Sequence, residues 1–194
     1  MYSQAHTVSF QLPDWIEIFC RDYRATTDIR RRMEFVIAAS RRNVETGTGG
    51  PFAAAIFESA TGNLVSLGVN LVTTQRLSML HAEMVATAVA QVKLNTYDLG
   101  DPSLPAHELF SSTEPCAMCL GAIPWSGVSR VITAARDEDA RDIGFDEGIK
   151  PDDWKASLIL RGIEVIDNIE AETANKVLLL YQHKNGQIYN PDQN

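Results

Sequence analysis

Two short segments, LHAEMVA and STEPCAMCLGA, restrict the folds open to this chain of 194 residues more than any other feature. The first contains His81, and the second contains Cys116 and Cys119, 35 positions further on. That interval has room for a helix, a loop and a strand. The chain can therefore return so that the starts of two helices face one another, one with an imidazole and the other with two thiolates. Three such ligands suit tetrahedral Zn²⁺ with one position left for water.

Each segment taken alone has a simpler explanation. A Cys-x-x-Cys pair at a helix start is also typical of a redox-active dithiol, because the helix start lowers the pKa of a thiol. Two small buried side chains are a further alternative. A histidine at a helix start can be a cap or a core residue. A structural zinc site needs a fourth protein ligand, and the sequence contains no second C-x-x-C and no H-x₃₋₅-H pair.

Glu83 follows His81 by two positions, near the start of the same predicted helix. A carboxylate there can reach a zinc-bound water and take its proton. The alternative is a first-turn glutamate that interacts only with the helix dipole. The apolar face expected for this helix consists of Met84, Val85, Ala88, Val89 and Val92.

Helical and strand patterns alternate along the chain. The order predicts an α/β protein with helices on both faces of one mixed sheet. We expect Thr27 or Asp28 to cap the first helix and Pro124 to lie near the end of another. The predicted helices cover residues 26–43, a segment from 81 onward, 116–125, 152–162 and 170–184, and the predicted strands cover 52–58, 63–70, 108–113, 128–135 and 163–167.

Composition excludes several classes of function. A net charge of −8 and a pI of about 5.0 argue against a nucleic-acid partner, which needs a basic face. The longest apolar runs are too short to span a bilayer, so we expect no membrane association. The first ten residues lack the pattern of a signal peptide, and three cysteines make a poor disulfide framework. A cytoplasmic location is the expectation.

His81-Ala82-Glu83 and Pro115-Cys116-Ala117-Met118-Cys119 reproduce the H-x-E and P-C-x-x-C pattern of zinc deaminases. The chain therefore resembles the cytidine and deoxycytidylate deaminase superfamily. The segments GGPFAAAIFE, LGVNLVTT, EPCAMCLGAIPWSGV and GFDEG are most similar to bacterial guanine deaminases, in particular a subgroup that also accepts ammeline. The similarity extends over residues 35–190.

The resemblance implies a three-layer α/β/α fold with a mixed sheet of about five strands. It divides the chain into an N-terminal extension (1–27), a catalytic domain (28–182) and a C-terminal tail (183–194) that can cover the active site. It also implies a homodimer with one Zn²⁺ per subunit, held by His81, Cys116 and Cys119. The implied partner is a small nucleobase or triazine.

The implied reaction is hydrolytic deamination, most simply of guanine to xanthine and ammonia, with Glu83 moving the protons. The alternatives are a cytosine or tRNA-adenosine deaminase of the same superfamily and, further away, a non-catalytic zinc or thiol protein. Glu147 argues against the first two, because those members generally lack a second carboxylate at this spacing.

Further site residues follow from the resemblance. Phe52 corresponds to the aromatic residue that packs on the base, and Asn70 to the base-binding asparagine. Glu147 corresponds to a second carboxylate near the leaving amine. The remaining substrate-binding candidates are Ala54, through its backbone, and Trp125, Phe145, Asp146 and Tyr189.

Overall fold

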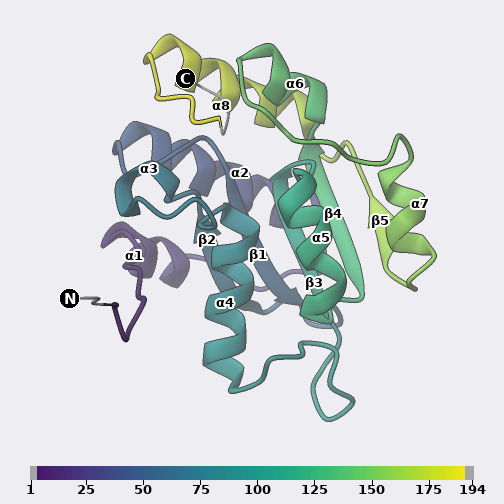
Figure 1. Cartoon of the computed structure of the whole chain (residues 1–194). Helices are drawn as coiled ribbons and strands as arrows, with labels where there is room; N and C mark the ends of the chain where they lie inside the picture. Colours follow the sequence, from purple (N-terminus) through teal and green to yellow (C-terminus); the bar gives the residue numbers. More distant parts are fainter. Residues whose placement is uncertain (1–3, 191–194) are drawn as a thin grey trace.

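The structure, a computed structural model, describes residues 4–190. In this part of the chain five strands form one mixed sheet between layers of helices, in the spatial order β2-β1-β3-β4-β5 (Figure 1). The predicted fold class, α/β with helices on both faces, is confirmed. The strands are β1 (Ala53–Glu58), β2 (Leu64–Val69), β3 (His107–Thr113), β4 (Arg130–Ala135) and β5 (Glu164–Ile166).

The helices agree with the sequence pattern where they are long. They are α1 (Trp15–Arg21), α2 (Ile29–Glu45), α3 (Val72–Gln75), α4 (Ala82–Leu94), α5 (Ala117–Ser126), α6 (Asp137–Asp142), α7 (Trp154–Ile159) and α8 (Ala171–His183). Asp28 caps α2 by accepting two backbone N–H groups, and Asp153 caps α7. The sequence pattern did not predict α1, α3 or α6, which have seven residues or fewer and complete too few turns to show a clear period.

Strand direction determines where the two ligand-bearing segments meet. β1 is antiparallel to β2 and β3, whereas β3, β4 and β5 run parallel. β2 and β3 are both antiparallel to β1 and so run in the same direction, and the carboxyl ends of β2, β3 and β4 therefore lie at the same edge of the sheet. The chain leaving β2 leads through α3 to His81 and α4, the chain leaving β3 enters α5, and the chain leaving β4 enters α6 and the loop of residues 143–151. Sites in sheets with parallel strands form at this edge.

Each face of the sheet has its own core. Residues of α2 and α8 pack on one face, with α1 beside them, whereas α4, α5 and α7 contribute most of the apolar layer on the other face (Figure 1). The predicted N-terminal extension joins the first core through α1, whose Ile16 is buried. The extension's residues 1–3 and the tail's residues 191–194 lie outside the described residues.

The apolar face that we predicted for α4 is confirmed at Val85, which is buried, and at Val89, which packs against the core, but it is wrong at its end. Val92 is 82% exposed, and the residues that face the sheet are small ones such as Ala82, Ala86 and Ala90. The cause is the close approach of α4 to β2 at Gly68, where an added Cβ would lie 2.4 Å from the backbone of both Ala82 and Ala86. Small residues allow this approach, and it fixes the helix that begins next to His81.

α5 agrees with the prediction to within one residue at each end, and Pro124 lies near its end, where Gly127 follows in a left-handed conformation. Among residues 4–190, the structure contains no helix with the length and apolarity that crossing a membrane requires.

Candidate active site

The starts of α4 and α5 bring the three predicted metal ligands together. His81 is the N-cap of α4, Cys116 is the N-cap of α5, and Cys119 lies in the first turn of α5. The His81 Nδ1 atom is 3.3 Å from Cys116 Sγ, and the ligand atoms of the three residues all lie within 4.8 Å of one another. Donors around tetrahedral Zn²⁺ are roughly 3.5–3.8 Å apart, so this arrangement fits the ion.

The three side chains of the cluster shift one another's pKa values. The hydrogen bond from Cys119 lowers the pKa of the Cys116 thiol to about 4, with burial opposing this shift and His81 supporting it. The same hydrogen bond, together with burial, raises the pKa of Cys119 well above its usual value. Burial lowers the pKa of His81, but the hydrogen bond and charge of Cys116 outweigh it and raise this pKa overall. Cys116 is therefore a thiolate, the form that binds metals.

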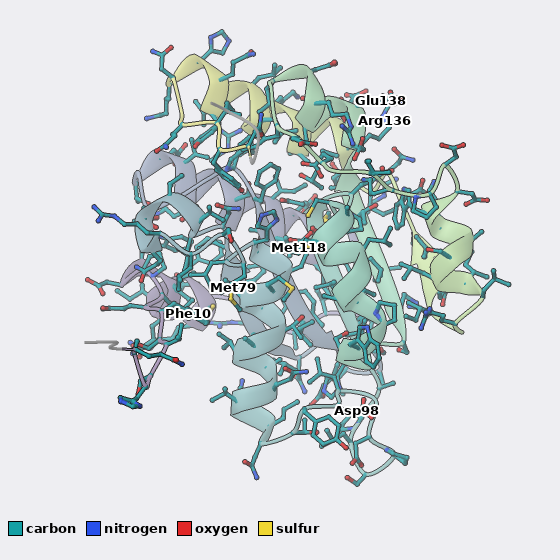
Figure 2. The ribbon with its side chains drawn as sticks, in the orientation of Figure 1. Phe10, Met79, Asp98, Met118, Arg136 and Glu138 are labelled. Carbon is teal, nitrogen blue, oxygen red and sulfur yellow. The ribbon has the colours of Figure 1, made fainter. Side chains whose placement is uncertain are left out.

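Met118 shows why the spacing of the cysteines matters. It lies between them in sequence and is 39% exposed, and Figure 2 labels its side chain near α5. Cys116 and Cys119, three positions apart, are both buried and point to the same side as His81. This is the helical spacing that places two side chains on one face.

Glu83 lies in the first turn of α4 and points inward. Its side chain is buried, and Ser111 Oγ donates a hydrogen bond of 3.4 Å to Glu83 Oε1. Burial raises the pKa of the Glu83 carboxyl, and the negative charge of Cys116 raises it further. A carboxyl group with a raised pKa beside a metal cluster is suited to accept and return a proton.

A cavity of about 30 Å³ adjoins the cluster. It has room for about two water molecules and far too little for a nucleobase. Most of the predicted site residues line it, together with three residues that were not predicted. Its lining consists of Phe52, Asn70, His81, Glu83, Ser111, Thr113, Glu114, Cys116, Phe145, Asp146, Glu147 and Tyr189.

Two predicted substrate-binding residues lie elsewhere. Trp125 is 82% exposed, and it follows Cys116 by nine positions in α5, about 13 Å along the helix axis. Ala54 is buried inside β1, paired with Gly68 on one side and Ser111 on the other, and it does not line the cavity. The structure therefore assigns neither residue to the cavity.

Asn70 enters the cavity from the end of β2. It is fully buried, and its Nδ2 donates a hydrogen bond to the hydroxyl of Tyr189. Asn43 Nδ2 donates to the backbone carbonyls of Asn70 and Gly50 at 3.0 and 2.9 Å. Gly49 is required here, because a Cβ would lie 1.9 Å from the Asn70 carbonyl oxygen. The segment TGTGGP therefore holds Asn70 in position.

Three aromatic rings close the cavity. The Phe145 ring centre is 4.9 Å from that of Phe52 and 5.4 Å from that of Tyr189, with near-perpendicular planes in both pairs. The Tyr189 ring also contacts His81, with centres 6.0 Å apart. Burial raises the pKa of Tyr189, so its hydroxyl keeps its proton. Residues of the C-terminal tail thus cover the cavity of their own chain.

Glu147 faces the same cavity from the loop after α6. It is 6% exposed, and its backbone carbonyl accepts a 2.9 Å hydrogen bond from the N–H of Ala117, next to Cys116. Burial raises the pKa of the Glu147 carboxyl to about 8, with a further contribution from the charge of Cys116. Two buried carboxyl groups, Glu83 and Glu147, therefore face one small space.

Ser111, Thr113 and Glu114 line the cavity without having been predicted. A signal for the first two exists in the sequence. Leu109 belongs to the core beneath α4 and α5, and side chains alternate along a strand, so Ser111 and Thr113 face the same side. Two hydroxyl residues on the buried face of a strand that leads into a metal motif indicate a polar pocket.

The family model for the cytidine and deoxycytidylate deaminase zinc-binding region matches residues 26–135, more than half of the chain. The chain belongs to this deaminase family. The resemblance predicted from the H-x-E and P-C-x-x-C segments is thereby confirmed. The matched region includes His81, Cys116 and Cys119 and ends before Glu147, so the family model does not cover the second carboxylate.

Individual members of the deaminase family are similar over larger or smaller regions. Guanine deaminase of Bacillus subtilis is 41% identical over 104 residues, which are 54% of this chain and 62% of that protein, less than two thirds of its length. The solved structure of guanine deaminase from Nitrosomonas europaea has a TM-score of 0.88 at 39% identity and covers 94% of this chain and 100% of that chain.

A further structure, solved in complex with 2,6-diaminopurine, has a TM-score of 0.88 at 42% identity and covers 94% of this chain and 96% of that chain. The predicted three-layer fold is therefore that of solved guanine deaminase structures.

Proposed function

We propose that the protein is a zinc-dependent hydrolase that deaminates guanine to xanthine and ammonia. The observation that carries this proposal is the pair of buried carboxyl groups, Glu83 and Glu147, on one cavity beside the His81–Cys116–Cys119 cluster. The similarity to guanine deaminases and to a structure with bound 2,6-diaminopurine supports a purine substrate.

The donor set of two thiols and an imidazole fits Zn²⁺, and it leaves the fourth position of a tetrahedral site for water or substrate. When bound there, zinc makes water acidic enough to act as a nucleophile near neutral pH. A site with four protein ligands would lack this position, so the cluster supports catalysis over a purely structural role.

Glu83 moves the protons in the proposed reaction. Its carboxylate accepts a proton from the attacking water and passes it to a ring nitrogen of guanine. The water oxygen forms a bond to C2, and Glu83 then takes the second proton from the hydroxyl now on C2 and gives it to the amino nitrogen as the bond from C2 to that nitrogen breaks. Water and guanine are consumed, and xanthine and ammonia are formed, with no oxidant or reductant.

Asn70, Phe52 and Glu147 bind the base in this proposal. The Asn70 amide can both donate to and accept from a purine edge, and Phe52 offers a ring to pack on. Glu147 accepts hydrogen bonds from the donor groups of guanine, including the amino group that leaves. Cytosine and adenine present a different set of donors, so Glu147 selects against them.

Substrate entry requires a movement of the tail. The cavity of about 30 Å³ cannot hold a purine, and the Tyr189 hydroxyl already occupies the Asn70 amide. A base therefore displaces Tyr189 from Asn70 as it binds. The free-base reaction suits such an enclosed site, whereas a tRNA loop needs an open one. The charge of −8 also disfavours tRNA.

Ammonia release from guanine, cytosine, adenine and ammeline tests the proposal, with the zinc content of each preparation measured. We expect activity on guanine, and a fall of about 10²–10⁴-fold in kcat for Glu83→Gln at unchanged zinc content. Activity on ammeline as well would extend the substrate class to triazines. Activity on cytosine or tRNA adenosine in place of guanine would contradict the substrate assignment.

The homodimer and the cytoplasmic location stay predictions. Sedimentation equilibrium of the zinc-loaded protein tests the first, with a mass near twice 21.4 kDa as the expected result.

A further inference from the structure

The side chain of Asn190, in the C-terminal tail, bridges the backbone on both sides of Phe145. Asn190 Oδ1 accepts a 2.9 Å hydrogen bond from the N–H of Asp146, and Asn190 Nδ2 donates one of 2.9 Å to the carbonyl of Gly144. In an extended segment the carbonyl of one residue and the N–H two residues later point the same way. A carboxamide supplies one acceptor and one donor, as a neighbouring strand would.

The bridged segment carries Glu147. Asp146 directly precedes it, and the Glu147 carbonyl is held by the N–H of Ala117 at the start of α5. On the other side, Arg141 Nη2 of α6 donates a 2.9 Å hydrogen bond to the Gly148 carbonyl. The Glu147 loop therefore has attachments to α5, to α6 and, through Asn190, to the tail.

Hydrogen bonds to α6 and the packing of the Phe145 ring hold one side of this segment. The N–H groups of Gly144 and Phe145 donate hydrogen bonds of 2.9 and 3.2 Å to carbonyls of α6, and Gly144 has a φ of 106°, which glycine adopts without a steric penalty. The paired hydrogen bonds from Asn190 hold the other side, at the Gly144 carbonyl and the Asp146 N–H, directly before Glu147. The neighbouring tail residue, Tyr189, is the one that fills the cavity and contacts Asn70.

We propose that Asn190 is a positioning residue that couples closure of the tail to the placement of Glu147. The coupling rests on the proposed function, because it needs a tail that opens for the substrate and a Glu147 that acts on it. When the tail lifts, the Asn190 bridge breaks and the segment 144–146 is released. When the tail closes over the base, the bridge reforms and holds Glu147 in its working position.

Steady-state kinetics on guanine with Asn190→Ala tests this coupling. Because Asn190 itself does not line the cavity, we expect kcat to fall about tenfold while KM changes less than about twofold. The same substitution in a Glu147→Gln background should have no further effect on kcat, since the residue through which Asn190 acts is already disabled. Asn175→Ala is the matched control, because the Asn175 amide bonds Asp139 of α6 and not the loop.

Two results would overturn the coupling. One is a rise in KM at unchanged kcat, which would mean that Asn190 only holds the tail closed. The other is an equal fall in kcat on Asn190→Ala whether residue 147 is glutamate or glutamine, which would mean that Asn190 does not act through Glu147.

Amide hydrogen exchange of the zinc-loaded protein separates this inference from the proposed function. Faster exchange of the Asp146 amide in Asn190→Ala, but not in Asn175→Ala, supports the role of the Asn190 bridge even if guanine is not the substrate. Unchanged exchange of the Asp146 amide in Asn190→Ala would refute that role whatever the substrate is.

Discussion

Gly68 is the position where one added methyl group tests how the fold holds the site. Its Cβ would lie 2.4 Å from the Ala82 carbonyl oxygen, 2.4 Å from the Ala86 nitrogen and 2.9 Å from the Ala86 Cα. All three are backbone atoms of α4, so no side-chain rotation relieves the clash. Ordinary contacts are near 3.5 Å, and α4 would have to retreat by about 1 Å.

The expected cost of Gly68→Ala follows from this retreat. Overpacking of a core costs about 1–3 kcal/mol, and the upper end applies because only backbone can move. In a chain of this size that lowers Tm by roughly 6–12 °C. The N-terminal end of α4 carries His81 and Glu83, and an error of about 1 Å in a catalytic group can cost roughly 10²-fold in rate.

Thermal unfolding of the zinc-loaded protein, with kcat on guanine measured in parallel, checks both consequences. Gly121→Ala is the control, since Gly121 is exposed in α5 and its Cβ would meet nothing within 4 Å. Alanine is the better helix former there, so the control should gain about 0.8–1 kcal/mol. A Gly68→Ala protein with wild-type Tm and kcat would refute the close packing of α4 on β2.

Three further predictions concern the tail, the pH response and α5. Tyr189→Phe frees the Asn70 amide without removing the ring, so KM for guanine should fall severalfold with kcat within about twofold, and a rise in KM would count against displacement. Burial raises the pKa of Cys20 to about 11, so the unfolded chain loses this proton first and stability should decline as pH rises from about 9 to 11. Urea unfolding of wild type and Cys20→Ala across this range measures the difference, and identical slopes would exclude the effect. Trp125→Ala should leave KM for guanine within about twofold of the wild-type value, because the ring is exposed. A large increase in KM would show that Trp125 contacts the substrate.

The group of three candidate metal ligands could be predicted because its chemistry depends on residue type and short spacing. A histidine before one helix and two cysteines three positions apart at the start of another need only a topology that brings the two helix starts together. The fold supplies this topology, since β2 and β3 run in the same direction, both antiparallel to β1, and so end at one edge of the sheet. Glu83 followed from its distance to His81 along the same helix.

The contents of the cavity were harder to predict because they depend on contacts between distant segments. Trp125 and Phe52 are both aromatic residues near a motif, but Trp125 lies nine positions beyond Cys116 along α5 and is exposed, which its residue type does not reveal. The face of α4 was misjudged because the pattern of large apolar residues does not reveal that Gly68 brings the helix close. The bridge from Asn190 to the Glu147 loop joins segments 44 positions apart, and neither segment has a pattern that indicates it.

The central claim is that the protein replaces the amino group of guanine with an oxygen from water, with Glu83 moving the protons. The most direct measurement is mass spectrometry of the product formed from guanine in H₂¹⁸O by the zinc-loaded protein. The account predicts xanthine with one ¹⁸O at C2, and no labelled xanthine above background from Glu83→Gln at equal zinc content. Absence of labelled xanthine from wild type, or equal formation by Glu83→Gln, would contradict it.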